Sequence, residues 1–250
     1  MAQSKYFHNL KELLKPLTPG IDWAVVQGTN LTVVYYEMYG GAPMSIAPHK
    51  HGNEQLSLIV EGELELMIED ETQVLHAGQL AYIGPDQKHF GKPIGQHLKM
   101  IDVFRPQRLD HVEKYNGLPV VSPACEEALE IPFDKYPKFI DFLDYDIELK
   151  EGMNLAPFNC DTMTAALLQV GIDPGEDEHH HIYEQVNTYL AGEMVMTVNG
   201  ESCVVGPGWV VTVPPDVPHA GLMTKPALQV NFSSPSRGEG YADFLRGVFK

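Results

Sequence analysis

The chain has 250 residues, of which 44% are hydrophobic, and its 17 basic and 34 acidic residues give a formal net charge of −17 at pH 7. This length fits one or two domains with packed cores, and the acidic balance opposes a nucleic-acid partner. No stretch approaches the roughly 20 apolar residues that cross a bilayer, and the three cysteines are far apart. We therefore expect a cytoplasmic protein with reduced thiols and no membrane partner.

The first elements predicted are a helix and two strands. Residues 4–15 place aromatic and leucine side chains at helical spacing before Pro16, which predicts a short amphipathic helix over the first domain. Residues 22–26 and 31–39 read as strands. In the second strand Glu37 should face solvent, so Tyr36 should face the interior. Tyr36 is a candidate substrate-binding residue, and the alternative is a core tyrosine with a hydrogen-bonded hydroxyl.

A group of metal-ligand side chains follows. Residues 48–55 read P-H-K-H-G-N-E-Q, and His49 and His51 occupy alternate positions, so on a strand they point the same way. Gln55 falls on that face, and His89 returns to it after predicted hairpins. Three neutral imidazoles and one amide oxygen can converge on a divalent cation at about 2.0–2.2 Å. The pattern predicts a metal site.

The same pattern recurs in the second half of the chain, with the same internal spacing. The second set is His179, His181, Gln185 and His219. A single H-x-H pair is often incidental, whereas a repeated four-residue set is not, and a repeat of this length indicates two similar domains. We place them at residues 1–125 and 126–250. Each should bind one divalent transition metal, and imidazole ligands accept Fe, Zn, Ni, Co, Cu or Mn.

The connector and the second copy complete the chain. Residues 109–144 lose alternation and gain prolines, with helices expected at 125–129 and 136–143. Strands are expected at 145–149 and 162–170, and a docking helix at 240–248. Each copy ends in P-x-R, and we expect these arginines to tie down the end of the last strand rather than to touch substrate. They are Arg108 and Arg237.

Residues beyond the glutamine on the ligand face differ between the copies. The first copy continues with Ser57 and Ile59, and the second with Asn187 and Tyr189. Asn187 and Tyr189 are candidate substrate-binding residues, and the alternative is a buried, hydrogen-bonded pair. Because they reach farther than Ser57, the sequence favours the second copy for chemistry. No catalytic residue is assigned.

These motifs resemble those of the cupin family. In the first cupin motif H-x-H is followed by Glu and then Gly. Here glutamine takes the Glu position in both copies, and Gly62 and Gly192 follow. The second motif is met by Gly208, Pro214 and His219, while the first copy has Gly84 where proline is usual. The resemblance implies an all-β fold of two tandem cupin barrels (double-stranded β-helix, jelly roll) with short peripheral helices, and a homodimer.

The glutamine bears on the chemistry, because an amide leaves the full charge on the ion and so preserves its strength as a Lewis acid. The ligand set and the strand-ending arginines resemble the bicupin isomerases of bacilysin biosynthesis. That resemblance implies a non-redox isomerase that shifts a double bond in a small 2-oxo acid by metal-assisted enolisation. Two alternatives remain open: an Fe(II)-dependent dioxygenase of the quercetinase or diketone-cleaving type, and a non-enzymatic barrel that binds a small molecule with its metal.

Overall fold

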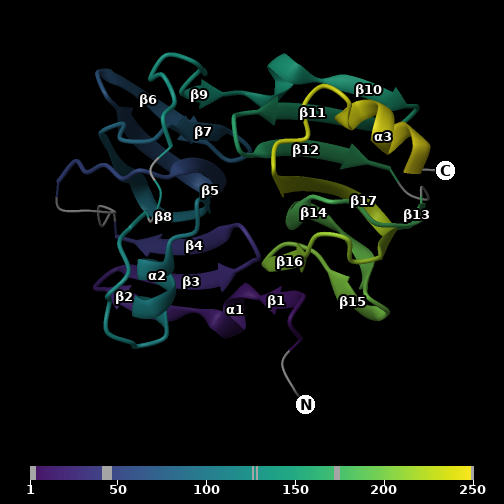
Figure 1. Cartoon of the computed structure of the whole chain (residues 1–250), viewed down its shortest axis with the longest axis horizontal. Coiled ribbons are helices and arrows are strands. Elements are labelled where there is room, and N and C mark those ends of the chain that lie inside the picture. Colours follow the sequence, from purple (N-terminus) through teal and green to yellow (C-terminus); the bar gives the residue numbers. More distant parts are fainter. Residues whose placement is uncertain (1–3, 41–46, 126, 128, 172–174, 249–250) are drawn as a thin grey trace. The chain divides into compact units, whose positions relative to one another are not determined.

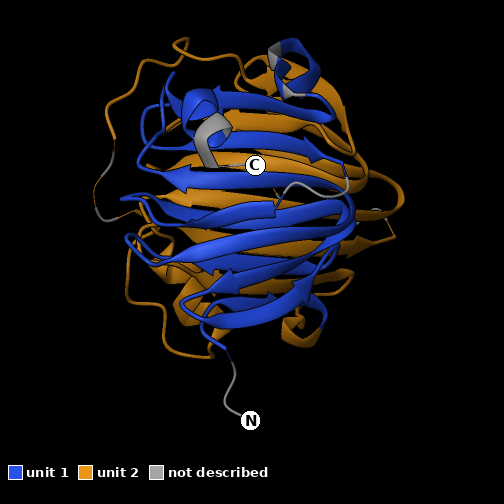
Figure 2. Cartoon of the chain, turned by 90° about the vertical axis from the view of Figure 1, so that its right-hand side faces the viewer, with its two compact units in different colours: residues 1–11, 142–250 blue, residues 12–141 orange. Residues whose placement is uncertain are grey.

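The computed structural model describes residues 4–40, 47–125, 127, 129–171 and 175–248. The chain divides into two compact units (Figure 2). Residues 12–141 form the first barrel, and residues 1–11 with 142–250 form the second barrel. The expected division after residue 125 differs from this one. The connector up to residue 141 stays with the first barrel, because β9 (Phe139–Ile140) pairs with β7 (Leu80–Ile83).

The first barrel is a sheet of antiparallel strands in the order β2-β3-β4-β8-β5-β7-β9, and β6 pairs with β5 (Figure 1). Besides β7 and β9, its elements are β2 (Lys15–Thr18), β3 (Ile21–Gln27), β4 (Thr32–Tyr39), β5 (Glu54–Ile68), β6 (Glu71–His76), β8 (His89–Arg105) and α2 (Leu109–Tyr115). The long strands β5 and β8 pair along almost their whole length.

The second barrel repeats this plan in the order β1-β16-β14-β17-β12-β11-β10, and β13 pairs with β17 and β15 with β14. Its elements are β1 (Phe7–Asn9), η1 (Phe142–Tyr145), β10 (Ile147–Lys150), β11 (Met153–Asn159), β12 (Thr164–Val170), β13 (Gly175–His179), β14 (Glu184–Val198), β15 (Glu201–Val205), β16 (Trp209–Val213), β17 (His219–Ser234) and α3 (Tyr241–Val248). Because β5 and β14 begin at matching positions of the two copies, Glu54 and Glu184, the repeat is confirmed, as is the all-β fold.

Alternation along the strands builds each core. In the first barrel Val34, Tyr36 and Met100 face the same buried interior. Each barrel also needs one glycine at a register shift, at Gly62 and Gly192, where φ is +86° and +85°. A Cβ at Gly62 would collide with the carbonyl oxygen of His97, and one at Gly192 with that of Pro226. These glycines are therefore set by backbone geometry.

The expected helix over residues 4–15 is wrong. The helix α1 covers only Leu10–Leu13, and the preceding residues form β1, which pairs with β16 of the second barrel. Tyr6 and Phe7 are buried in the core of that barrel. The spacing that suggested a helix therefore reflects a short strand and one helical turn, because the edge of β16 supplies hydrogen-bond partners.

The connector also differs from expectation. Residues 136–143 hold β9 and the start of η1 rather than a helix, and residues 125, 127 and 129 are not helical, while 126 and 128 lie outside the described residues. Instead α2 follows β8 directly. The C-terminal helix is confirmed as α3. Among the described helices none is long and apolar enough to cross a membrane.

Candidate metal centres

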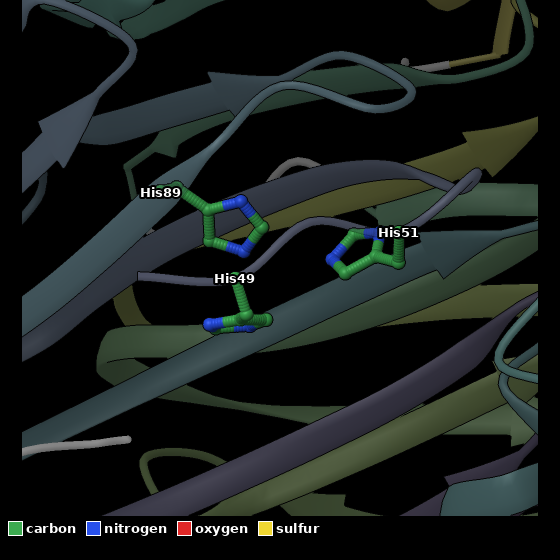
Figure 3. Close-up of side chains that lie close together, drawn as sticks. All are labelled: His49, His51 and His89. Carbon is green, nitrogen blue, oxygen red and sulfur yellow. The ribbon is translucent and has the colours of Figure 1, made fainter. Parts of the chain in front are cut away.

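The first histidine triad forms where the chain enters β5 and β8. His49 and His89 exchange two backbone hydrogen bonds, at 3.0 and 2.8 Å, which hold their rings 4.3 Å apart. His51 completes the group, and one ring nitrogen of each residue lies within 4.8 Å of the others. Figure 3 shows the three rings around a shared space. The convergence expected from the sequence spacing is present.

The donor atoms of this triad fit a divalent metal ion. The Nδ1 atom of His89 donates to the carbonyl oxygen of Gln87 at 2.9 Å, so its Nε2 carries the lone pair that a metal needs. Gln55 Oε1 lies 3.0 Å from His51 Nε2. Two ligand atoms at about 2.1 Å from one ion, at right angles, would be about 3 Å apart. Burial lowers the pKa of His51 to about 2 and that of His89 to about 4, so both rings are neutral near pH 7.

A cavity of about 270 Å³ opens beside the first triad, within the first barrel. Tyr36 lines it, as expected for an interior-facing residue of β4, and its role toward a substrate remains a prediction. Other polar residues that the sequence did not single out as site residues also line the cavity, among them Asp102, Arg108, His111 and Lys114.

Asp102 places a carboxyl group on the interior face of β8, cross-strand from Ser57. Burial raises its pKa to about 7, and hydrogen bonds with Ser57 and Gln55 and the charge of Arg108 oppose that rise. The sequence signal was available, because an acidic residue lies between the inward Met100 and Phe104. Recognising it requires the register of β8.

Arg108 follows β8 and reaches the same cavity, so the expectation that it only ties down the strand end is incomplete. Its Nε and Nη2 atoms donate to the two carboxylate oxygens of Asp110, at 2.9 and 2.8 Å. Nη2 also lies 2.8 Å from Nε2 of His111. These contacts leave Nη1 without a hydrogen-bond partner in the part of the chain that the structure describes.

The second triad has the same arrangement and is more uniform. The Nδ1 atoms of His179, His181 and His219 donate to backbone carbonyl oxygens of Asp177, Tyr183 and Val217, at 2.8, 2.9 and 3.0 Å. All three Nε2 atoms therefore carry lone pairs, and the ring nitrogens lie within 4.8 Å of one another. Either triad could hold a metal ion. In the second barrel, however, Arg237 donates to both His181 and Gln185. The expectation that Arg237 only ties down the strand end is therefore incomplete as well.

The two predicted substrate-binding residues of the second barrel are buried. Asn187 and Tyr189 lie on β14 as expected, 2% exposed each, and their role toward a substrate stays a prediction. Glu176, which the sequence did not single out, has its carboxyl oxygen 3.5 Å from His179 Nε2, and burial raises its pKa to about 7. The matching position of the first copy is Ile46, so the repeat gives no signal for this acid.

Comparisons with known proteins agree with this architecture. A family model described as the cupin domain matches residues 34–104 and 168–227. The H2HPP isomerase of Bacillus subtilis is 26% identical over 203 residues, which cover 77% of this chain and 75% of that protein.

Two solved structures show the same fold. A single-residue mutant of Bacillus subtilis oxalate decarboxylase matches with a TM-score of 0.68 and 17% identity, over 93% of this chain and 78% of that one. AerE from Microcystis aeruginosa matches with a TM-score of 0.69 and 15% identity, over 92% and 99% of the two chains. At these identities the likeness concerns the fold alone.

Proposed function

Because this chain belongs to the cupin family, whose domain model matches both of its barrels, we propose that it is a metal-dependent, non-redox isomerase that acts in its first barrel. The substrate proposed is a small 2-oxo acid or a related biosynthetic intermediate, in which the enzyme moves a double bond by enolisation. The observation that carries the proposal is the cavity of about 270 Å³ beside the first triad.

The sequence favoured the second barrel for chemistry, whereas we place the reaction in the first. The first cavity brings the predicted metal ligands together with one carboxyl group and one guanidinium, from Asp102 and Arg108. In the second barrel the guanidinium of Arg237 contacts the ligands themselves. A substrate and an ion have more room to meet in the first barrel.

The residues of the cavity have separate roles in this proposal. A divalent ion held by His49, His51, His89 and Gln55 would supply a Lewis acid for a substrate oxygen. Arg108 offers Nη1, which has no hydrogen-bond partner among the described residues, to a substrate carboxylate, since Asp110 already fixes its other side. Asp102 is the group placed to carry a proton, and Ser57 orients it.

The reaction step balances without an oxidant. The Asp102 carboxylate accepts a proton from a carbon next to the substrate carbonyl, and the electron pair of that C–H bond forms the enolate double bond. The Asp102 carboxyl group exchanges this proton with solvent and then delivers a proton to a different carbon of the conjugated system. The double bond has moved, and no electron has left the substrate.

The relative from Bacillus subtilis supports the class of reaction, because its name is that of an isomerase and it aligns over three quarters of both chains. The glutamine ligand also supports it, since an amide keeps the charge of the ion available for polarising a carbonyl. The distinction from a dioxygenase or a binding barrel is left to experiment.

The test is turnover in D₂O with a panel of 2-oxo acids that carry a conjugated double bond, under an oxygen electrode. An isomerase should give an ultraviolet change and one solvent deuterium in the product, with no oxygen uptake. Iron-dependent oxygen uptake would establish the dioxygenase instead. Saturable binding with neither signal would establish a binding barrel. His51→Ala is the control, because it should abolish every metal-dependent signal of the first barrel.

A further inference from the structure

The second histidine site already contains a cation, the guanidinium of Arg237. Its Nη2 atom lies 2.6 Å from His181 Nε2 and 2.7 Å from Gln185 Oε1, and its Nε donates to Ser233 Oγ at 3.0 Å. The side chain is 8% exposed. Arg237 therefore uses two of the four ligand atoms that a metal ion in this barrel would use.

The protonation of the histidine makes this contact a donor–acceptor match. His181 donates its Nδ1 hydrogen to the carbonyl oxygen of Tyr183 at 2.9 Å, so Nε2 is an acceptor. Arginine has only donors, and the amide oxygen of Gln185 only accepts. The lone pairs that would bind a metal thus point at the guanidinium. The Nε2 atom of His219 is buried and has no hydrogen-bond partner among the described residues.

Aromatic side chains fix the guanidinium in this place. Its central carbon lies 4.7 Å from the ring centre of Tyr183, 4.5 Å from that of Tyr241 and 5.4 Å from that of Phe244. Tyr241 and Phe244 belong to α3, which packs on the barrel core. Cation–π contacts at these distances favour a desolvated cation. Arg237 lies between β17 and α3, and side chains of both elements contact its guanidinium.

The first barrel lacks this arrangement, although Arg108 has the matching place after the last strand. There Asp110, two residues on, binds the guanidinium in a bidentate pair. In the second barrel the residue two positions after Arg237 is Glu239, which is exposed. No ion pair to Arg237 is found within the described ranges. An unpaired guanidinium must find other acceptors, and the nearest are metal ligands.

We infer that Arg237 is the resident cation of the second His-Gln site, so that the chain binds one metal ion tightly, in the first barrel. A second ion would have to enter beside a fixed positive charge and displace it from two ligands. The two sites, which have the same ligand types and spacing, are therefore unequal in metal affinity.

The experiment is a Co²⁺ titration of the metal-free full chain, followed by calorimetry and by metal analysis after gel filtration. We expect one tightly bound ion per chain and a second that is lost on the column. Two ions of equal affinity in the wild-type protein would overturn the inference. This measurement needs no variant, so it decides the question even if a substitution impairs folding.

A variant series then tests the cause. In a His51→Ala/His89→Ala background, which leaves the second site alone, Arg237→Met should raise Co²⁺ affinity about tenfold or more, in the range that residues around metal ligands control. Unchanged affinity would contradict the inference. Arg108→Met, in a His181→Ala/His219→Ala background, is the matched control and should leave the first site near its wild-type affinity. An equal gain in Co²⁺ affinity at the first site would show that removing any nearby positive charge has this effect. That result would also contradict the inference.

Discussion

The guanidinium of Arg108 and the carboxylate of Asp110 form a two-bond ion pair, with Nε 2.9 Å from Oδ1 and Nη2 2.8 Å from Oδ2. The side chains are 10% and 17% exposed, so solvent weakens the pair little. We expect this pair to keep Arg108 off the ligands of the first barrel, because Arg237, whose matching residue is the exposed Glu239, does contact the ligands of the second.

Asp110→Asn should therefore lower the metal affinity of the first barrel. Once released, Arg108 can approach His51 and Gln55 as Arg237 approaches their counterparts, and we expect a loss of about tenfold or more in Co²⁺ affinity. Calorimetric titration measures it. Glu239→Gln is the control, since Glu239 is exposed and its removal should leave second-site affinity unchanged. Wild-type affinity in Asp110→Asn would show that the ion pair does not restrain Arg108.

Asp102→Asn should stop turnover while leaving the metal in place. An amide of the same shape cannot accept a proton from carbon, so the rate should fall by about 10²–10⁴-fold, the usual contribution of a positioned acid or base. Deuterium incorporation should fall in parallel. Metal analysis must show wild-type content, because Asp102 is not among the predicted ligands. A variant that keeps its rate would remove Asp102 from the mechanism, and Ser57→Ala should show a smaller loss than Asp102→Asn.

His111 should make the folded protein less stable as the pH falls below 6.5. Its Nε2 accepts a hydrogen bond from Arg108 at 2.8 Å, which requires a neutral ring, and burial followed by the charge of Arg108 lowers its pKa from 6.5 to about 4. Above pH 6.5 the ring is neutral in both the folded and the unfolded state, so its titration adds no pH dependence to stability there. Between pH 6.5 and about 4 only the unfolded chain binds the proton, so stability falls as the pH drops through this window.

Urea unfolding of the metal-free protein across that pH range measures the effect. His111→Gln keeps a hydrogen-bonding side chain without a titrating group, so its free energy of unfolding should fall less steeply between pH 6.5 and 4 than that of the wild type. His76→Gln is the control, because the side chain of His76 is 58% exposed. Equal slopes for wild type and His111→Gln would contradict the prediction.

Short-range spacing was enough to predict much of this structure. Histidines stand at alternate positions where the chain enters β5 and β14, and this spacing predicted both triads. Its repetition in the second half of the chain predicted the tandem barrels. The same reasoning failed at residues 4–15, because helical spacing of Tyr6 and Leu10 does not reveal the open edge of β16, which comes near the other end of the chain. A partner that distant in the sequence decides between helix and strand.

The roles of the arginines needed the structure for a related reason. Both follow the last strand of their barrel in the same P-x-R motif, yet their contacts differ because one has Asp110 and the other the exposed Glu239. The buried acids are similar: Asp102 and Glu176 acquire their environment from packing in the barrel interiors. Each acid is present in only one of the two copies, so the repeat does not reveal it. The strand period alone does not show that either acid is buried in a barrel.

The N-terminal segment should stabilise the second barrel and not the first. Tyr6 is 2% exposed, its hydroxyl accepts a hydrogen bond from Asn199 at 3.1 Å, and its carbonyl oxygen accepts one from the Thr212 amide at 2.9 Å. Removing a buried aromatic ring costs about 3–5 kcal/mol, so Tyr6→Ala should lower the free energy of unfolding of that barrel by this amount.

The two tryptophans allow this to be measured barrel by barrel, since Trp23 lies in the first and Trp209 in the second. In a Trp23→Phe background the urea transition reported by Trp209 should shift to lower concentration with Tyr6→Ala. In a Trp209→Phe background the transition reported by Trp23 should stay in place. The reverse pattern would assign residues 1–11 to the first barrel.

Gly62→Ala should destabilise the first barrel much more than Gly95→Ala. Both glycines have positive φ, +86° and +80°, so each substitution carries the strain of the left-handed region, about 1–2 kcal/mol. At Gly95 a new Cβ would meet nothing within 4 Å, whereas at Gly62 it would collide with the backbone of His97. The difference between the two variants, measured by urea unfolding with Trp23 as reporter, isolates that collision. Since it involves backbone atoms of a paired strand, β8 must shift away from β5 to relieve it, and equal stabilities would mean that this shift costs nothing.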